Sequence, residues 1–472
     1  MSVPIRFGTD GWRAIMAREF TFDNVAIVAQ AVACYLKDAG KADRGVFIGY
    51  DARLLSDLFT QTIADVLSAN GITVYLPPRD TPTPVTMFTI GHMGLGGGIM
   101  MTASHNPPAY NGLKFQPDTL HPALPEITDA IEVHIRRIQE QHIAVDRTPR
   151  PALQHRIDPL PPYFEHLKTL LDCDVLSTLK AVYDPLHATG RGYVDRFLAE
   201  TGAQVETIKG DWNPAFGGAL PDPNEANTRF LAQRVLETGA TIGLSTDGDA
   251  DRFGIVDSDG TWISPNRVIV LALHYLLERR KPARTAVVRT VATTHQVDAR
   301  AQAYGGIEVI ETPVGFKWVG SNMKAHNALI GGEESGGFSI AGHIPEKDGI
   351  LADLLIAEMV ARTGKSCGTL LQEIEQITGP FVTDRIDIHM DPATKDRLMA
   401  QLRSDPPASI AGETVTGTDT RDGVKLRMQD GSWCLIRPSG TEPMIRCYAE
   451  AASAERLAAI QSAVENLQST SS

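Results

Sequence analysis

Three aspartates at alternate positions are the residues of this chain best suited to chemistry. Asp247, Asp249 and Asp251 are separated by single small residues and followed by Arg252. Carboxylates with this spacing can converge on one hard cation such as Mg²⁺, which prefers oxygen ligands. Crowding three carboxylates without a cation is unfavourable, so a solvated acidic turn is the weaker interpretation. The loop therefore predicts a magnesium site.

Two other carboxylate motifs fail on the same loop. A calcium EF-hand counted from Asp247 needs Gly where Arg252 stands and Glu where Ser258 stands. A haloacid-type phosphatase motif, D-x-D-x-[TV], needs Thr or Val at Asp251. Neither alternative fits the residues that are present.

The hydroxyl of Ser104 is a second candidate, because an apolar, glycine-led stretch over residues 96–101 stops just before it. A strand that ends there exposes the hydroxyl. The glycines do not form a dinucleotide loop, since Ile99 stands where G-x-G-x-x-G needs its third Gly. Taken alone, the pair Ser104 and His105 is more often a turn than a nucleophile.

The glycine-rich loop 331–337 carries Glu333 and Ser335 after an apolar strand expected at 328–330. A carboxylate and a hydroxyl suit hydrogen bonding to sugar hydroxyls, which both donate and accept. An exposed polar turn is an equally good interpretation of this loop alone.

The loop from Arg437 to Arg446 has the composition of an anion clamp. It combines two guanidiniums with the hydroxyls of Ser439 and Thr441 and the amides of a turn at Gly440. Phosphate is the ligand that such a set of donors binds best. On an acidic chain this local basic cluster predicts a phosphate site.

A strand–helix–strand pattern recurs three times in the sequence and would position these loops. The units open with strands expected at residues 46–50, 181–183 and 286–288, and close with Gly-x-x-Val at 71–74, 202–205 and 306–309. Each Gly is the expected helix cap. The pattern predicts an α/β fold with three related βαβ-type domains and mixed, mainly parallel sheets.

The last part of the chain differs from these units. Strands expected at 424–428, 433–437 and 444–449 are joined by tight turns, and a helix follows from about residue 455. We therefore expect a C-terminal α+β domain, and a division into residues 1–147, 148–256, 257–370 and 371–472. The first three motifs follow strands of different units, so we expect them to meet in a central cleft.

The amino-acid composition limits the classes of partner and the cellular compartment that we expect for this protein. Lys plus Arg is 44 and Asp plus Glu is 57, a net charge of -13 that argues against nucleic-acid and anionic-membrane surfaces. The N-terminus has no apolar signal region, and the most apolar stretch, 268–277, is too short to span a bilayer. Five scattered cysteines predict reduced thiols. These features predict a cytoplasmic protein.

Taken together, the motifs resemble the α-D-phosphohexomutases, a family that includes phosphoglucomutase, phosphomannomutase and phosphoglucosamine mutase. The resemblance rests on FGTDGWR at 7–13, TASHNP at 102–107, the loop 247–252, the loop 332–336 and the loop 437–446, in the family's order. It implies four domains around a central cleft, which bear the phosphoserine, the metal, the sugar site and the phosphate site in turn.

The resemblance also implies a role for each residue. Ser104 would hold a phosphoryl group, and its oxygen would bind Mg²⁺ together with Asp247, Asp249 and Asp251. The groups that flank the transfer would be Arg13, His105, Lys114 and Arg252. The sugar and its second phosphate would meet Glu333, Ser335, Lys317, Arg437, Ser439, Gly440, Thr441 and Arg446.

The implied chemistry accounts for these residue types. Phosphoryl transfer needs charge neutralisation, because the transition state spreads negative charge over the equatorial oxygens. Phosphoserine would donate to a hexose monophosphate, and the resulting hexose 1,6-bisphosphate would turn round and return its other phosphoryl group. A general base is needed for the attacking hydroxyl, and both Lys114 and His105 are candidates.

Two departures from the family pattern bear on the sugar. Phe316-Lys317 follows Gly315 where phosphomannomutases usually have His and phosphoglucosamine mutases have Asp-Arg, and Gly337 stands where both usually have His. The pair Glu333-Glu334 is similar to the phosphoglucomutase version. We therefore expect glucose phosphate first and mannose phosphate next, with glucosamine phosphate as a further alternative.

Two functions of other classes can be compared with the mutase. A catalytically silent sugar-phosphate sensor would need neither Ser104 nor three aspartates. A phosphatase would lose the phosphoserine to water, which a closed cleft suppresses. The expected partners are small-molecule hexose phosphates, and the sequence carries no signal for an oligomeric state.

Overall fold

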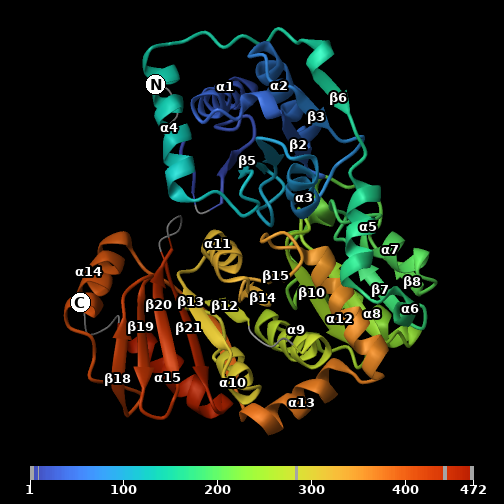
Figure 1. The fold of residues 1–472 in the computed structure, drawn as a ribbon. Helices are drawn as coiled ribbons and strands as arrows, with labels where there is room; N and C mark the ends of the chain where they lie inside the picture. Colours follow the sequence, from blue (N-terminus) through green and yellow to red (C-terminus); the bar gives the residue numbers. More distant parts are fainter. Residues whose placement is uncertain (1–4, 9, 282–284, 440–443, 468–472) are drawn as a thin grey trace.

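The computed structural model describes residues 5–8, 10–281, 285–439 and 444–467. Figure 1 shows the chain passing through four sheets in sequence order, the first three with helices against them and the last at the C-terminal end. Within these ranges no helix is long and apolar enough to cross a membrane. The five cysteines are free thiols, three of them buried.

The first sheet has the order β1-β5-β4-β2-β3-β6. Strands β3 and β4 flank β2 in parallel, and β5 returns antiparallel to β4. The strands are β1 (Trp12–Ile15), β2 (Val46–Tyr50), β3 (Val74–Leu76), β4 (Gly97–Met101), β5 (Tyr110–Pro117) and β6 (Gln154–Arg156). The helices are α1 (Phe22–Asp38), α2 (Ser56–Ala69), α3 (Thr83–Met93) and α4 (Pro125–Glu140).

The second sheet, β11-β10-β9-β7-β8, begins with parallel strands and ends in a hairpin. Its strands are β7 (Lys180–Asp184), β8 (Gln204–Thr207), β9 (Ile242–Thr246), β10 (Phe253–Asp257) and β11 (Trp262–Ile263). Its helices are α5 (Leu160–Leu170), α6 (Cys173–Leu176), α7 (Val194–Glu200) and α8 (Arg229–Thr238).

The third sheet, β13-β12-β14-β15, repeats this plan with two parallel pairs and one hairpin. Its strands are β12 (Ala286–Thr290), β13 (Glu308–Thr312), β14 (Ile330–Glu333) and β15 (Gly337–Ile340). Its helices are α9 (Pro265–Arg280), α10 (Gln296–Ala303), α11 (Phe316–His326), α12 (Gly349–Thr363) and α13 (Cys367–Thr378). One apolar core runs through the second and third units, because α9 and α12 pack against both.

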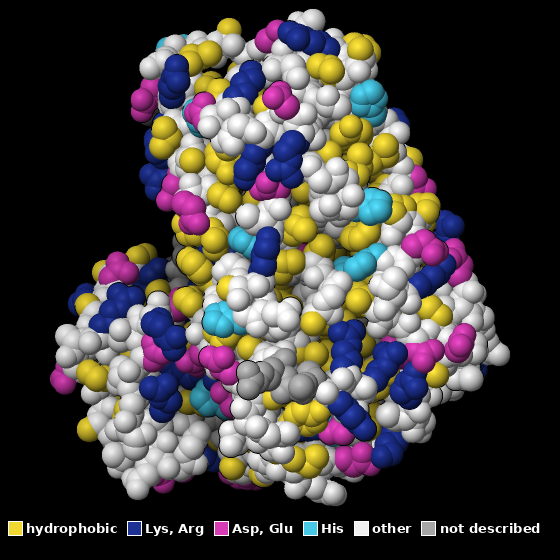
Figure 2. All heavy atoms as spheres, in the orientation of Figure 1, with side chains coloured by type: hydrophobic (Ala, Val, Ile, Leu, Met, Phe, Trp, Pro, Cys, Tyr) yellow, Lys and Arg dark blue, Asp and Glu magenta, His cyan; other side chains and the backbone are white. Residues whose placement is uncertain are grey.

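The fourth sheet, β16-β21-β20-β19-β18-β17, is antiparallel throughout and has its own core. Its strands are β16 (Val382–His389), β17 (Ser409–Ile410), β18 (Glu413–Asp419), β19 (Val424–Met428), β20 (Trp433–Pro438) and β21 (Met444–Ala451). Helices α14 (Pro392–Ser404) and α15 (Ala454–Asn466) complete it. Figure 2 shows the surface hollowed between this domain and the first one. The predicted fold class, three α/β units and an α+β domain, is confirmed.

The ends of the strands differ from the sequence expectation in one respect. Strand β14 continues to Glu333, three residues beyond the end expected at residue 330, and β9 continues to Thr246, directly before Asp247. The last two residues of β9 are polar and hydrogen-bonded: Ser245 Oγ donates to the Asp184 carbonyl at 2.7 Å, and Thr246 Oγ1 bonds the Tyr183 hydroxyl at 2.7 Å. Both motifs therefore start directly at the ends of strands.

The expected domain division stays a prediction, and two strands cross its lines. Strand β6 follows residue 147 but pairs with β3 of the first sheet. Strand β11 follows residue 256 but pairs with β10 of the second sheet. Short edge strands of this kind are hard to read from a sequence, because few residues carry the pattern.

Candidate active site

Ser104 stands in the loop after β4, with its hydroxyl turned inward. Its φ of 49° is left-handed, a conformation that residues with a Cβ rarely adopt and that the surroundings must enforce. The Ser104 N–H donates to Thr102 Oγ1 at 2.7 Å, and Oγ donates to Asp247 Oδ2 at 3.1 Å. The first two motifs of the sequence therefore meet, hydroxyl to carboxylate.

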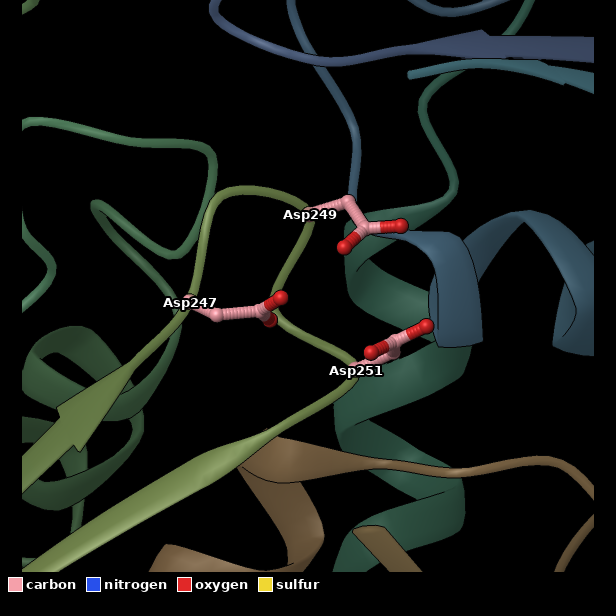
Figure 3. A group of neighbouring side chains, drawn as sticks. All are labelled: Asp247, Asp249 and Asp251. Atoms are coloured by element: carbon pink, nitrogen blue, oxygen red, sulfur yellow. The ribbon is translucent and has the colours of Figure 1, made fainter. Parts of the chain in front are cut away.

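The loop between β9 and β10 holds the three aspartates together. Figure 3 shows their carboxylates turned toward a common space, and one oxygen from each of Asp247, Asp249 and Asp251 lies within 4.8 Å of the others. Ala250 at φ 57° makes the turn, and the Arg252 N–H donates to Asp247 Oδ1 at 3.0 Å. All three carboxylates are buried.

The first domain holds the aspartate loop at two points. A Cβ on Gly248 would lie 2.4 Å from the Ser104 carbonyl oxygen, so only glycine allows the two loops to approach this closely. Thr83, at the start of α3, donates its N–H to the Asp249 carbonyl at 2.9 Å and its hydroxyl to Asp249 Oδ2 at 2.6 Å. The Ser104 hydroxyl and the carboxylates are thus fixed to each other.

The donor set suits a cation that prefers oxygen ligands. Asp249 Oδ1 and Asp251 Oδ1 are buried and have no hydrogen-bond partner within the described part of the chain. Burial and the two neighbouring carboxylates raise the pKa of Asp247 well above its usual range. Burial acts the same way on Asp249, but Lys114 overrides it and lowers that pKa. The buried triad can therefore bind a metal ion.

Two lysines face the aspartates. Lys114 Nζ on β5 lies 2.8 Å from Asp10 Oδ2, 2.9 Å from Asp249 Oδ2 and 3.1 Å from Asp251 Oδ2. Lys347, between β15 and α12, lies 3.2 Å from Asp251 Oδ2. Burial alone would lower the pKa of Lys114, but the three carboxylates raise it well above its usual value. Lys114 is accordingly a cation in this arrangement.

Three more of the predicted residues lie around Ser104. His105 Nδ1 is 3.3 Å from Ser104 Oγ. The positive charge of Arg252, burial and Arg13 lower the pKa of His105, so its imidazole is neutral. Arg13 Nη1 donates to Asn106 Oδ1 at 2.8 Å. The predicted catalytic group thus comes together as one cluster.

The sequence reasoning missed Lys347 and its neighbour Glu346. Both are buried, and burial raises the pKa of Glu346 to about 8 although Lys347 lowers it. They precede Asp348, which caps α12 by accepting from the Leu351 N–H at 2.9 Å. A lysine just before a capping aspartate has the pattern of an ordinary helix start. The signal available in the sequence was a charged run, Glu346-Lys347-Asp348, after a strand of the third unit.

The loop from Glu333 lies beside the aspartate loop, since the Phe253 N–H donates to the Gly336 carbonyl at 3.1 Å. Ser335 Oγ donates to Glu333 Oε1 at 2.7 Å, while Glu333 Oε2 is buried with no partner among the described residues. Burial and the charge of Glu333 raise the pKa of Glu334 to about 7. Glu333 and Ser335 therefore lie together, and Glu333 Oε2 is an acceptor without a hydrogen-bond donor among the described residues.

Two of the predicted phosphate residues, Arg437 and Arg446, lie on strands of the fourth sheet. Arg437 and Arg446 are directly opposite in the β20–β21 ladder, which brings two guanidinium-bearing residues together. Arg437 Nε donates to Asp422 Oδ1 at 2.7 Å, and Asp422 Oδ2 accepts from the Val314 N–H at 2.9 Å. Ser439 follows and is buried. Gly440 and Thr441 lie outside the described residues.

Lys317 is the remaining predicted residue and begins the first turn of α11. Its Nζ lies 5.7 Å from the centre of the Trp318 ring. Burial lowers the pKa of its ammonium, and the charge of Asp10 raises it. Lys317 is thus half-buried in the first turn of α11.

Models of one protein family match the chain domain by domain. Those described as phosphoglucomutase/phosphomannomutase, alpha/beta/alpha domains I, II and III, match residues 4–142, 161–260 and 264–377. The model of the family's C-terminal domain matches residues 390–467. The order of the four matches is the order of the four sheets.

Relatives match over nearly the whole chain. The phosphoglucomutase/phosphomannomutase of Thermococcus kodakarensis is 30% identical, over 95% of each chain, and the phosphoglucomutase of Komagataeibacter xylinus is 30% identical, over 98% of this chain and 90% of its own. A solved structure from Thermus thermophilus, assigned to the phosphomannomutases, has a TM-score of 0.84 at 34% identity and covers 99% of each chain. The chain therefore belongs to the α-D-phosphohexomutase family and is an intramolecular phosphotransferase.

Proposed function

We propose that this phosphohexomutase interconverts glucose 1-phosphate and glucose 6-phosphate, with Ser104 as the phosphoryl carrier and glucose 1,6-bisphosphate as the intermediate. The observation that carries the proposal is the position of Ser104 Oγ, 3.1 Å from Asp247 Oδ2 at the edge of the buried aspartate triad. Oxygens of the triad and two buried lysines surround the point where charge would develop.

Mg²⁺ is the metal that this donor set would hold. Asp247, Asp249 and Asp251 would bind it together with the oxygen of Ser104, and the two orphaned carboxylate oxygens support this assignment. When bound, the ion would neutralise negative charge on the transferred phosphoryl group. Asp10 supports the lysines as an anion: burial would raise the pKa of Asp10, but Lys114, Lys347 and Arg13 lower it to about 2.

In the first half of the reaction the bond between phosphorus and Ser104 Oγ breaks, and a bond to the free hydroxyl oxygen of the sugar monophosphate forms. The hydroxyl proton leaves to a base, and Ser104 Oγ takes up a proton. His105 Nδ1, 3.3 Å from Ser104 Oγ, is placed to exchange that second proton. The sequence candidates for the base of the sugar hydroxyl are His105 and Lys114. Lys114 could serve only after losing the proton that its three carboxylate neighbours stabilise, and separate His105→Gln and Lys114→Met variants test the two residues.

In the second half the bisphosphate returns its other phosphoryl group to Ser104 Oγ, and the same proton transfers run in reverse. The non-reacting phosphate would be held by Arg437, Ser439, Gly440, Thr441 and Arg446. The opposed pair Arg437 and Arg446 supports this role, because two guanidiniums at paired positions of neighbouring strands can both donate to one phosphate. Glu333 and Ser335 would accept and donate hydrogen bonds to the sugar, with Lys317 nearby.

Glucose is favoured by the packing at Gly337. A Cβ there would lie 2.4 Å from Lys347 Cδ and 2.5 Å from its Cγ, so a side chain at this position displaces Lys347. This is the position where the mannose and glucosamine members usually carry His. The chain instead uses the space for Lys347, whose ammonium reaches Asp251.

The test is phosphorus NMR of the purified protein with Mg²⁺ and a trace of hexose 1,6-bisphosphate. Glucose, mannose and glucosamine 1-phosphates are followed in separate tubes, and we expect the glucose tube to form its 6-phosphate fastest. Faster conversion of mannose phosphate would overturn the choice of sugar. Release of inorganic phosphate in place of the 6-phosphate would indicate a phosphatase, and no conversion in any tube would contradict the mutase reaction.

A further inference from the structure

The guanidinium of Arg53, three residues beyond β2, is bonded at every donor. Its Nε donates to Asp51 Oδ2 at 3.1 Å, and its four remaining N–H groups go to backbone carbonyls. The carbonyls are those of Ser104 and Asn106 at 2.6 Å each, Pro107 at 2.8 Å and Tyr110 at 3.0 Å. An arginine has five N–H donors, so none is left for a ligand.

The guanidinium is itself fixed from all sides. The side chains of Arg53 and Asp51 are both fully buried. Asp51 Oδ1 accepts from the Arg53 N–H at 3.0 Å and from Ser56 Oγ at 2.9 Å. The ring of Phe216, from the second domain, lies 5.1 Å from the guanidinium carbon. Strands β2 and β4 are parallel neighbours, which brings Asp51 and the Ser104 loop to the same edge of the sheet.

The carbonyls that Arg53 binds span the whole loop that carries the nucleophile. They begin at Ser104, whose left-handed φ of 49° needs enforcement, and end at Tyr110, the first residue of the strand that bears Lys114. Carbonyl oxygens directed at Arg53 are directed away from Ser104 Oγ. An anionic phosphoryl group on Ser104 would be repelled by any carbonyl that turned toward it.

We propose that Arg53 is a positioning residue for phosphoryl transfer: by binding four carbonyls it holds the Ser104 loop in the one shape that aims the hydroxyl at the aspartates. The proposal rests on the function proposed for Ser104. It assigns Arg53 an effect on the transfer step and none on sugar binding, because its donors are all used within the loop.

The experiment compares Arg53→Lys with Arg300→Lys. Lysine keeps the charge but has three donors on one atom, so it cannot span four carbonyls. Arg300 is the control, since it is also buried and bonds His274 and Glu278 of α9. For Arg53→Lys we expect kcat to fall by about 10²-fold, the size of loss that a small misplacement of reacting groups causes, with KM near that of the wild type. The ³¹P resonance of phosphorylated Ser104 should shift. Arg300→Lys should change neither.

Several outcomes would overturn the proposal. They are an unchanged kcat in Arg53→Lys, an unshifted phosphoserine resonance, or equal losses of kcat and thermal stability in both lysine variants. If Arg53→Lys does not fold, Asp51→Asn decides, because it removes the buried charge that fixes the Arg53 guanidinium against the carbonyls: a reduced kcat with constant KM supports the proposal, and an unchanged kcat overturns it. Ser104→Ala in the same assay distinguishes failure of this proposal from failure of the proposed function. Activity in that variant would contradict the proposed function itself.

Discussion

The proposed reaction centre around Ser104 and the proposed phosphate clamp around Arg437 are built in opposite ways. The centre draws Lys114, Asp249 and Lys347 from three domains into one buried cluster of ion pairs. The clamp lies on an antiparallel sheet with its own core, and the side chain of Arg437 is 22% exposed. A displacement within the centre disturbs all three domains, whereas the clamp belongs to one.

The contacts that join the fourth domain to the third differ from the buried ion pairs of the reaction centre. They combine one small apolar cluster around Trp433 with ion pairs of Glu311, which bonds Lys425 at 3.0 Å and Arg421 at 2.6 Å. Polar interfaces of this kind tolerate small relative movements of domains. Such movement would help a clamp that has to hold the phosphate of a sugar bound in two orientations. The transfer step, in contrast, requires fixed geometry.

The largest effect should come from the nucleophile of the centre. Ser104→Ala removes the atom that we propose as the phosphoryl carrier, so we expect kcat to fall on the order of 10⁴-fold with little change in thermal unfolding. Steady-state turnover and circular dichroism measure the two. Ser409→Ala, on the exposed edge strand β17, is the control. Near-wild-type turnover of Ser104→Ala would mean that the centre described here is not the reacting one.

The second prediction concerns the metal. Chelation should abolish turnover, and Asp249→Asn should raise the Mg²⁺ concentration needed for half-maximal activity by about 10²-fold, because the variant loses a charged oxygen ligand. Titration of turnover with Mg²⁺ after chelation measures this. Asp259→Asn, in the turn after β10, should titrate like the wild type. Full activity in excess chelator would contradict the metal site.

The sequence predicts one part of the reaction centre and misses another. Asp247, Asp249 and Asp251 are neighbours in the chain, so their spacing alone predicts a cation site. Lys347 and Arg53 carry no such signal, since one looks like part of a helix cap and the other like a surface residue before α2. Their roles arise from contacts between segments far apart in sequence, which local patterns do not encode.

The clamp shows the same division between residues that the sequence predicts and residues that only the fold reveals. The predicted residues Arg437 and Arg446 stand opposite each other in the ladder, as the expected pair of strands requires. The sequence reasoning missed Asp422, which joins the clamp to the third domain through the Val314 N–H. An aspartate before a glycine has the pattern of a turn, and its two partners become visible only in the fold.

The third prediction tests whether the clamp acts apart from the centre. Asp422→Asn weakens the support of Arg437, so we expect KM for the sugar phosphate to rise about 10-fold, equivalent to about 1.4 kcal/mol, with kcat nearly unchanged. Asp419→Asn, which pairs with Arg421 in the same hairpin, is the control. Steady-state kinetics separates the two constants. A fall in kcat at constant KM would place Asp422 in the reaction centre and break the comparison.

The smallest effect concerns Glu334, which lies between the two regions and accepts from Thr290 Oγ1 at 2.8 Å. Burial and Glu333 raise its pKa from 4.5 to about 7, so the folded state binds the proton more tightly than the unfolded state. Its contribution to stability is full below about pH 4.5 and is lost as pH rises through about 7. Glu334→Gln should therefore match the wild type near pH 4.5 and exceed its Tm by about 2 °C at pH 8. Glu308→Gln, on exposed β13, should show no such divergence. A wild type that gains stability over Glu334→Gln as pH rises would mean that Arg437 keeps Glu334 ionised, and would assign this residue to the clamp.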